Sequence, residues 1–338
     1  MLRLFPTNDA TPAPESDRLI LRDPVGGDVR ELIAHSESLR GVVEKARQIA
    51  ASKVPVLILG ESGTGKELIA RLIHEQSPRA RHRLVQVNCA AFSETLIESE
   101  LFGHEKGAFT GADQRHIGYF ERAHEGSLLL DEVGEMPAKL QAKLLRILEE
   151  EAFERVGGEI MLKVDVRIIA TTNRELEQET AHGAFRRDLY YRLNAMQLHV
   201  PPLRSRPQDI VPLAHYFIEK FGREGPVQVT SIAPRAMELL LAYSWPGNVR
   251  QLRNVIHYAC VVARGSCIGA TDLPPLRDPA VESLAPTHNQ TLAEIERRLI
   301  LETLREVGGN KTAAALRLGV TARTLQNKLK RYRAEDAA

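Results

Sequence analysis

The chain has 338 residues, 45 Lys and Arg against 44 Asp and Glu, and a formal net charge of +1. This length suits two or three domains. No apolar run approaches the roughly 20 residues that cross a bilayer, and the N-terminus lacks the sustained apolar stretch of a secretory signal. These features argue against membrane insertion and secretion, and we expect a cytoplasmic protein. Cys89, Cys260 and Cys267 cannot all pair and lack metal-ligand spacing, which predicts packing roles in a reducing compartment.

The N-terminal half of the chain predicts an α/β domain behind a short leader. Residues 1–28 are rich in Pro, Asp, Ser and Thr, which predicts a flexible leader too short for a sensory domain. Residues 29–205 begin with a helical stretch near 36–51, after which short apolar runs alternate with helix-length segments. This alternation predicts a mostly parallel sheet flanked by helices. The runs are residues 54–59, 84–87, 127–130, 166–171 and 195–200.

The C-terminal half divides into three further segments. Residues 206–272 have a helical pattern throughout, which predicts a smaller all-α subdomain. Residues 273–290 contain four prolines and read as a linker. Residues 291–338 return to helix, and within them residues 310–333 hold seven Lys or Arg and no Asp or Glu. Such a local basic segment suits an anionic partner.

A glycine-rich segment follows the first predicted strand and precedes an amphipathic helix. In this setting glycines let backbone N–H groups surround phosphate oxygens, and a lysine reaches the terminal phosphates. The alternative is a glycine-rich turn that matches by accident. A Glu stands where Ser or Thr usually contributes a hydroxyl to magnesium. The residues assigned to nucleotide binding are Gly60, Glu61, Ser62, Gly63, Thr64, Gly65, Lys66 and Glu67.

A second apolar strand, ending in Asp131 and Glu132, supplies two carboxylates. We expect Asp131 to hold a magnesium ion through water and Glu132 to orient and polarise the attacking water. The alternative is an exposed acidic turn. In an open α/β sheet, ligands bind at the carboxyl ends of strands, so these carboxylates and the phosphate loop should share one site.

Two of the other strand runs are followed by amide side chains. Asn173 could sense the γ-phosphate or position water, although an Asn after a strand is more often a turn residue. Asn88 could hold Glu132 away from the water until a partner arrives.

Arginines near residues 185–192 and in a later helix complete the candidate site. Arg186 and Arg192 could reach a neighbouring subunit and neutralise charge on its transferred phosphoryl group. The alternative is an ordinary solvated basic helix. Arg250, after the sequence WPGNV, could reach back to the nucleotide from the helical subdomain.

The basic C-terminal segment reads as helix, tight turn, helix. Asn310 and Thr321 are suitable N-caps, and Gly319 suits the left-handed position after the first helix. One face of the second helix is basic and points outward. This face could enter a major groove of double-stranded DNA. The alternative is a solvated basic helix in a small bundle. The candidate DNA-binding residues are Thr321, Arg323, Thr324, Asn327, Lys328, Lys330 and Arg331.

Together these segments resemble one family, the sigma-54-dependent activators of the AAA+ superfamily, also called bacterial enhancer-binding proteins. The most specific motif is GAFTGA, and the others occur in the family's order across about residues 30–333. The C-terminal stretch looks like a Fis-type helix-turn-helix. The motifs are GESGTGKE (60–67), VNCAA (87–91), GAFTGA (107–112), LLLDEVGEMP (128–137), FRRDLYYRLN (185–194) and WPGNVRQLRN (245–254).

The resemblance implies a three-layer AAA+ P-loop fold with an α-helical lid, and ATP and Mg²⁺ as cofactors. It also implies a role for each matched residue, and Glu67 fits because the family's phosphate loop has Glu there. Arg187 has no clear counterpart. The roles are the phosphate lysine for Lys66, the magnesium carboxylate for Asp131, the catalytic base for Glu132, its switch for Asn88, the first sensor for Asn173, the arginine fingers for Arg186 and Arg192, and the second sensor for Arg250.

The resemblance assigns the hexapeptide loop to contact with sigma-54. Two glycines permit a mobile hairpin tip, and the Phe and Thr between them present an apolar and a hydroxyl contact. Without the family, the Phe could simply tuck onto the surface. The loop would follow the γ-phosphate state and act on the closed complex of sigma-54 RNA polymerase. Its residues are Gly107, Ala108, Phe109, Thr110, Gly111 and Ala112.

Three functions fit the motifs. The first is an ATP-driven transcription activator that pairs as dimers on DNA and assembles into a hexameric ring. The second is a DNA-binding repressor or scaffold with an idle nucleotide site, which intact Lys66, Asp131, Glu132 and Arg186 disfavour. The third is another AAA+ machine, which would lack the GAFTGA loop. Many members carry a receiver domain and act in two-component systems. We expect this chain to lack a receiver domain. Its activity would then be controlled by a regulatory protein in trans, by its expression level, or not at all.

Overall fold

The computed structural model describes residues 18–22 and 29–276. In the C-terminal part it describes residues 296–297, 299–301, 303–304, 307, 310–318, 320–321, 324–326 and 328–329. The chain separates into two compact units, residues 1–274 and 275–338. Each unit is described by itself.

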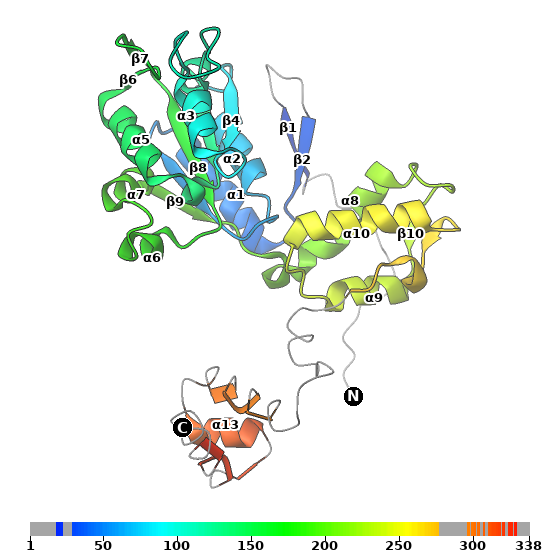
Figure 1. Ribbon diagram of the computed structural model, residues 1–338. Coiled ribbons are helices and arrows are strands. Elements are labelled where there is room, and N and C mark those ends of the chain that lie inside the picture. The colour runs from blue at the N-terminus through cyan, green and yellow to red at the C-terminus, as the bar shows by residue number, and fades with distance from the viewer. Residues whose placement is uncertain are drawn as a thin grey trace. The chain divides into compact units, whose positions relative to one another are not determined.

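A five-stranded parallel sheet forms the centre of the first unit (Figure 1). The strand order is β4-β5-β8-β3-β9, and every neighbouring pair is parallel. All five predicted apolar runs are strands, so the predicted parallel α/β sheet is confirmed. The strands are β3 (Val56–Leu59), β4 (Leu84–Asn88), β5 (Ser127–Asp131), β8 (Arg167–Thr172) and β9 (Met196–His199).

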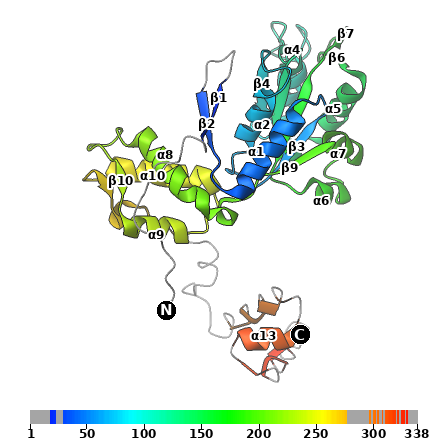
Figure 2. The ribbon, with the colours of Figure 1, turned by 180° about the vertical axis from the view of Figure 1, so that it is seen from behind.

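Helices cover both faces of this sheet and make it the middle of three layers (Figures 1 and 2). Successive strand residues point to opposite faces: Leu128 and Leu130 pack in one apolar cluster, and Leu129 packs in the other. Because both faces are buried, the strands read as continuous apolar runs. One face carries α1 (Glu37–Ala50) and α2 (Lys66–Glu75); the other carries α3 (Glu94–Phe102), α4 (Tyr119–Arg122), α5 (Ala138–Glu150) and α7 (Arg187–Leu193).

Part of the predicted leader is a strand. β1 (Arg18–Arg22) pairs antiparallel with β2 (Val29–Ile33). Leu21 of β1 is buried in the same apolar cluster as α1 and α2, so this strand has a core to join. The flexible leader is therefore wrong for residues 18–22, while residues 1–17 and 23–28 lie outside the described residues.

The lid of the first unit consists mainly of α8 (Ile210–Phe221), α9 (Pro234–Ala242) and α10 (Asn248–Val262). Short 3-10 turns, η3 (Leu203–Ser205) and η4 (Pro207–Asp209), lead from the sheet into α8. Two strands of two residues each, β10 (Ser231–Ile232) and β11 (Cys267–Ile268), pair in parallel. The predicted helical subdomain is confirmed, with this short strand pair as an unpredicted addition.

The C-terminal unit has its own small apolar core. Helix α13 (Lys311–Arg317) packs Ala314 and Ala315 against Ile300 and Leu325. Asn310 accepts a hydrogen bond at Oδ1 from the backbone N of Ala313, the predicted N-cap contact. Residues 319 and 330–333 lie outside the described residues.

Two expectations from composition can be compared with the structure. Among the described residues, every helix is too short or too polar to cross a bilayer. Cys89 and Cys260 are buried, but Cys267 is exposed at the start of β11. The predicted packing role is therefore wrong for Cys267, because β11 buries the side chain of its second residue and leaves that of the first in solvent.

Candidate active site

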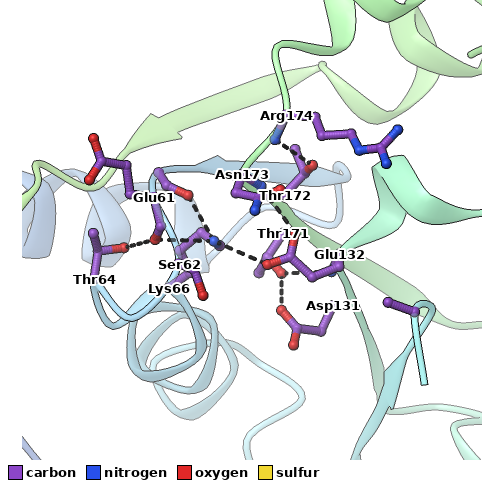
Figure 3. Close-up of polar contacts among 12 residues, drawn as sticks. Glu61, Ser62, Thr64, Lys66, Asp131, Glu132, Thr171, Thr172, Asn173 and Arg174 are labelled. Atoms are coloured by element: carbon purple, nitrogen blue, oxygen red, sulfur yellow. Dashed lines mark hydrogen bonds and ion pairs between the residues drawn. The ribbon is translucent and has the colours of Figure 1, made fainter. Parts of the chain in front are cut away.

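The carboxyl ends of β3, β5 and β8 meet at one edge of the sheet, as expected for a ligand site in an open α/β fold. The backbone N of Gly60, directly after β3, donates to the carbonyl of Thr172 at the end of β8, at 3.3 Å. Figure 3 shows side chains from all three strand ends converging on this edge. The predicted phosphate loop, carboxylates and Asn173 are thereby brought together.

The phosphate loop has the backbone that its glycines predict. Gly63 and Gly65 have φ of +78° and +103°, a region that L side chains rarely adopt. Helix α2 begins at Lys66, so its N-terminus faces the loop and favours negative charge there. The Lys66 ammonium donates to the Gly60 carbonyl at 2.8 Å and lies 3.5 Å from Glu132 Oε1 (Figure 3).

The two carboxylates are held by different groups at the end of β8. Asp131 accepts from the Thr171 hydroxyl at Oδ1, at 2.5 Å. Glu132 accepts from the backbone N of Asn173 at Oε2, at 3.1 Å (Figure 3). Glu132 also has φ of +53°, a left-handed conformation that is uncommon outside glycine and that recurs at functional sites. The hydrogen bond to Glu132 comes from the backbone of Asn173 and not from its side-chain amide.

Asn88 contacts the site in a different way from the prediction. Its amide donates to Asp131 Oδ2 at 3.3 Å. Its carbonyl Oδ1 accepts from the backbone N of Ala90 at 2.8 Å. Asn88 therefore contacts Asp131, the carboxylate predicted to hold magnesium, and its switching of Glu132 stays a prediction.

A cavity of about 460 Å³ lies between the phosphate loop, β2 and the lid. Arg250 lines it and donates to the Ser62 hydroxyl at 3.0 Å, as expected for a residue that reaches back from the lid. Glu67 also lines it, paired with Arg30 at 2.6 Å. Sequence reasoning missed several basic residues of this lining, because they lie far apart in the sequence and, except for Arg253 within WPGNVRQLRN, outside the motifs. The missed residues are Arg30, Arg206, Lys220 and Arg253.

The residues of this cavity fit a nucleoside triphosphate with its magnesium ion. Magnesium prefers oxygen ligands, keeps several waters, and binds one or two carboxylates together with substrate phosphates. Asp131 and Glu132 line the cavity beside Lys66, so oxygen ligands and a phosphate partner lie together. The basic lining supplies positive charge for the remaining phosphate oxygens.

The arginines of the 185–192 segment are on the surface. Arg186, half exposed, forms an ion pair with Asp188 at 2.7 Å, and hydrogen bonding from Arg186 lowers the pKa of Asp188. Arg192 caps the end of α5 by donating to the Leu148 carbonyl at 2.8 Å. Arg187 lies over the Tyr191 ring. Exposure of both candidate fingers is compatible with contact to another subunit.

The hexapeptide loop lies between α3 and α4 and presents its aromatic residue to solvent. The backbone N of Gly107 donates to the Ala112 carbonyl at 2.8 Å, which closes the loop at its base. Phe109 is 46% exposed and lies edge-on to the His104 ring, with 4.9 Å between centroids. The loop therefore displays a large apolar side chain with one ring contact beneath it.

A buried arginine makes the base of this loop rigid. Arg155 follows β6 (Ala152–Glu154), which pairs with β7 (Met161–Lys163). It binds Glu105 before the loop at 2.6 Å and Glu121 after it at 2.7 Å. These charge-assisted contacts fix both ends of the loop.

Comparison with known proteins decides the family. The "Sigma-54 interaction domain" model matches residues 32–199, the "AAA+ ATPase lid domain" model residues 204–289, and the "Bacterial regulatory protein, Fis family" model residues 291–332. "Regulatory protein AtoC" of Escherichia coli (strain K12) is 51% identical over 315 residues, covering 90% of this chain and 68% of that protein. This chain belongs to the sigma-54-dependent transcriptional activators. Its central domain is an AAA+ ATPase, and its C-terminal domain is a Fis-type DNA-binding domain.

Solved structures agree with this assignment of the activator. NtrX from Brucella abortus in complex with ADP superimposes with a TM-score of 0.68 at 36% identity, covering 91% of this chain and 70% of that one. The same protein in complex with ATP gives 0.67 at 36% identity, with 92% and 70% covered. The AAA+ P-loop fold with helical lid and C-terminal helix-turn-helix is therefore confirmed.

The DNA-binding domain of the activator is described only in part. Thr321 caps the second helix by accepting from the backbone N of Thr324 at 3.1 Å, and both residues are exposed. Lys328 pairs with Glu296 at 2.6 Å, so one candidate phosphate contact is engaged within the domain. The other candidates lie outside the described residues; they are Arg323, Asn327, Lys330 and Arg331.

Proposed function

We propose that this activator binds enhancer-like DNA sites and uses ATP hydrolysis to convert the closed complex of sigma-54 RNA polymerase into the open complex. The single observation that carries the proposal is the exposed Phe109, on a loop whose base is held by Arg155, in the same domain as the phosphate loop and its two carboxylates. Regulation of transcription by such a chain occurs in the cytoplasm.

Hydrolysis would follow from the residues at the strand ends. Lys66 and the phosphate-loop N–H groups would bind the β- and γ-phosphates, and Asp131 would hold the magnesium ion. The ion, when bound, neutralises charge on the phosphate oxygens. Glu132 lies where it can orient the attacking water and accept its proton, since Asn173 fixes one oxygen and leaves the other near Lys66.

Arginines from a second copy would complete the site. Arg186 and Arg192 are exposed and held only by Asp188 and the Leu148 carbonyl in the described contacts, which a phosphate in a neighbouring subunit can replace. Hydrolysis then depends on assembly, from dimers on DNA to a hexameric ring as in AAA+ machines. Control by a regulatory protein in trans would act on that assembly.

A continuous path supports coupling of the nucleotide site to the hexapeptide loop. Glu132 leads through η2 (Val133–Glu135) into α5. Lys139 of α5 binds Glu98 of α3 at 2.9 Å, and Lys143 binds the same carboxylate. Helix α3 ends five residues before Gly107. A change at Glu132 can therefore move α5, α3 and the loop base together.

The test is open-complex formation on a sigma-54 promoter with purified polymerase, this chain and an upstream binding site. ATP should yield open complexes, and a non-hydrolysable analogue should yield none. In parallel, ATPase activity per subunit should rise with protein concentration, because the arginines act between subunits. Steady DNA binding without hydrolysis at any concentration would instead identify a scaffold with an idle nucleotide site.

A further inference from the structure

Asn248 opens the lid helix α10 in a constrained position. Its side chain is fully buried, and its backbone has φ of +52°, a left-handed conformation that Asn tolerates better than most residues. Burying an amide without hydrogen-bond partners costs folding free energy. The partners of the Asn248 amide therefore explain how it can be buried here.

Every polar group of the Asn248 amide has a partner outside its own helix. Its nitrogen donates to the Ser62 carbonyl and to Glu61 Oε2, each at 3.1 Å. Its oxygen accepts from the backbone N of Leu203 at 2.8 Å. An Asn side chain has two N–H donors and one carbonyl acceptor. The amide thus joins the phosphate loop to the segment that leads into the lid.

The neighbouring backbone brings the lid still closer to the phosphate loop. The backbone N atoms of Val249 and Arg250 both point at the Gly63 carbonyl, at 3.0 and 3.3 Å. A Cβ on Gly63 would lie 2.5 Å from the Gly247 carbonyl, so only glycine permits this approach. Arg204 adds a two-pronged ion pair with Glu61, one bond of which is 2.8 Å.

A second attachment reaches the loop at Thr64. Arg206, buried, donates to the Thr64 carbonyl at 2.7 Å and pairs with buried Asp209 at 3.3 Å. Asp209 in turn accepts from the backbone N of Ser36 at 2.6 Å. The phosphate loop is therefore held by lid residues at Ser62, Gly63 and Thr64.

We propose that Asn248 is a positioning residue that makes the phosphate loop and the lid move as one body, so that the lid position sets nucleotide affinity. The inference rests on the proposed ATPase function. Asn248 acts through the Ser62 carbonyl and the Glu61 carboxylate. When the lid moves, its amide carries the Ser62–Gly63 peptides with it, and their N–H groups either face the phosphates or turn away.

The sharpest test is Asn248→Asp, which keeps the shape of the side chain and the acceptor for Leu203. It removes both donors and places a negative charge beside Glu61 and the Ser62 carbonyl. In full-length protein, we expect the KM for ATP and the Kd for a fluorescent ADP analogue to rise at least about tenfold. The kcat at saturating ATP should stay within about threefold, because the groups at the reacting phosphate are unchanged.

A rescue that exchanges the amide and the carboxylate between positions 248 and 61 separates positioning from simple damage to the fold. In the Glu61→Gln background the opposing carboxylate is gone and the new amide can donate, so adding Asn248→Asp should raise KM clearly less than it does alone, the remaining increase coming from the lost donor to the Ser62 carbonyl. Asn254→Asp is the matched control, because it makes the same chemical change on an exposed position of α10. Its KM should equal that of the unsubstituted chain.

A second variant covers the case in which Asn248→Asp fails to fold. Asn248→Gly suits the left-handed backbone and removes the side chain without adding charge, and it should raise KM in the same direction. A lower kcat with unchanged KM, or an equal KM effect in both Glu61 backgrounds, would overturn the inference. Failure of the proposed function would appear differently, as absent hydrolysis in the unsubstituted chain, while the ADP analogue would still report Asn248.

Discussion

Glu132 Oε2 accepts a hydrogen bond from the backbone N of Asn173 at 3.1 Å, which ties the end of β5 to the end of β8. The other oxygen of the same carboxylate lies 3.5 Å from the Lys66 ammonium. One side chain therefore contacts two other segments of the site, and its left-handed backbone turns it away from the strand direction. This geometry suits the proposed role of Glu132 as a base that is held in place before the reaction.

Replacing the base should stop hydrolysis without preventing binding. Glu132→Gln keeps the acceptor for Asn173 but removes the proton acceptor, so we expect kcat to fall by roughly 10²- to 10⁴-fold. The Kd for ATP, measured with a fluorescent analogue, should change only slightly. Glu135→Gln, which alters a carboxylate on η2 that pairs with Arg174, is the control. A Glu132→Gln protein with more than a tenth of the original kcat would contradict the assignment.

The arginine assignment predicts complementation between two inactive proteins. Arg186→Ala should lower kcat by about 10³-fold or more, and Arg192→Ala should act in the same direction. Mixing Arg186→Ala protein with Lys66→Ala protein should restore part of the ATPase activity, because the second supplies intact arginines to the first. Arg187→Ala is the neighbouring control and should keep most activity. A mixture as inactive as its components would show that Arg186 acts within its own subunit.

The contact between α3 and α5 predicts a pH-dependent stability effect. Burial alone would raise the pKa of Glu98, but hydrogen bonds from Lys143 and Lys139 bring it below its ordinary value of 4.5. A carboxylate with a lowered folded pKa stabilises the fold above its unfolded pKa, and this contribution is lost as the pH falls through the folded pKa. Glu98→Gln should therefore cost about 2 kcal/mol at pH 7 and less below pH 4.5.

Thermal unfolding of Glu98→Gln and the unsubstituted chain at pH 7 and near pH 4 measures this difference. Glu149→Gln, on the exposed side of α5, is the control and should change the Tm little at either pH. A Tm difference for Glu98→Gln that grows as the pH falls would have the wrong sign for this contact.

The three cysteines should differ in reactivity. Burial raises the pKa of Cys89 to about 12 and that of Cys260 to about 11, so neither forms appreciable thiolate at pH 8. Cys267 is exposed. A disulfide reagent should label one thiol per native chain quickly and three after denaturation. Cys267→Ser should abolish the fast phase, and two fast thiols in the native chain would contradict the burial of Cys89 or Cys260.

The sequence predicts the elements whose chemistry is local. All five strands of the sheet were predictable, because each is a short apolar run bounded by turn residues. The phosphate loop, Asp131 and Glu132 were predictable as well, because their backbone and side-chain requirements are met within a few residues of one strand. The strand β1 was not predictable, since its five residues follow a proline-rich polar segment and owe their order to pairing with β2.

Contacts between distant segments could not be predicted from the sequence. Asn248 and Glu61 are 187 positions apart, and only the fold places the lid against the phosphate loop. The same holds for Arg206 and Thr64, which are 142 positions apart. The single sequence signal for Asn248 was its position in WPGNVR, a motif in which only Arg250 was assigned a role. For Asn88 the sequence did indicate the residue but not its contact. Its predicted partner was Glu132, whereas its partner in the structure is Asp131.

The central claim is that hydrolysis at the strand ends does work through the hexapeptide loop, and Thr110→Ala tests it most directly. ATPase activity and open-complex formation on a sigma-54 promoter should be measured on the same preparation, with Asp113→Asn, just beyond the loop, as the control. The account predicts ATPase activity within about twofold of the unsubstituted chain and at least a tenfold loss of open complexes, since only the partner contact is removed. Equal open-complex formation by Thr110→Ala and the unsubstituted chain would contradict it.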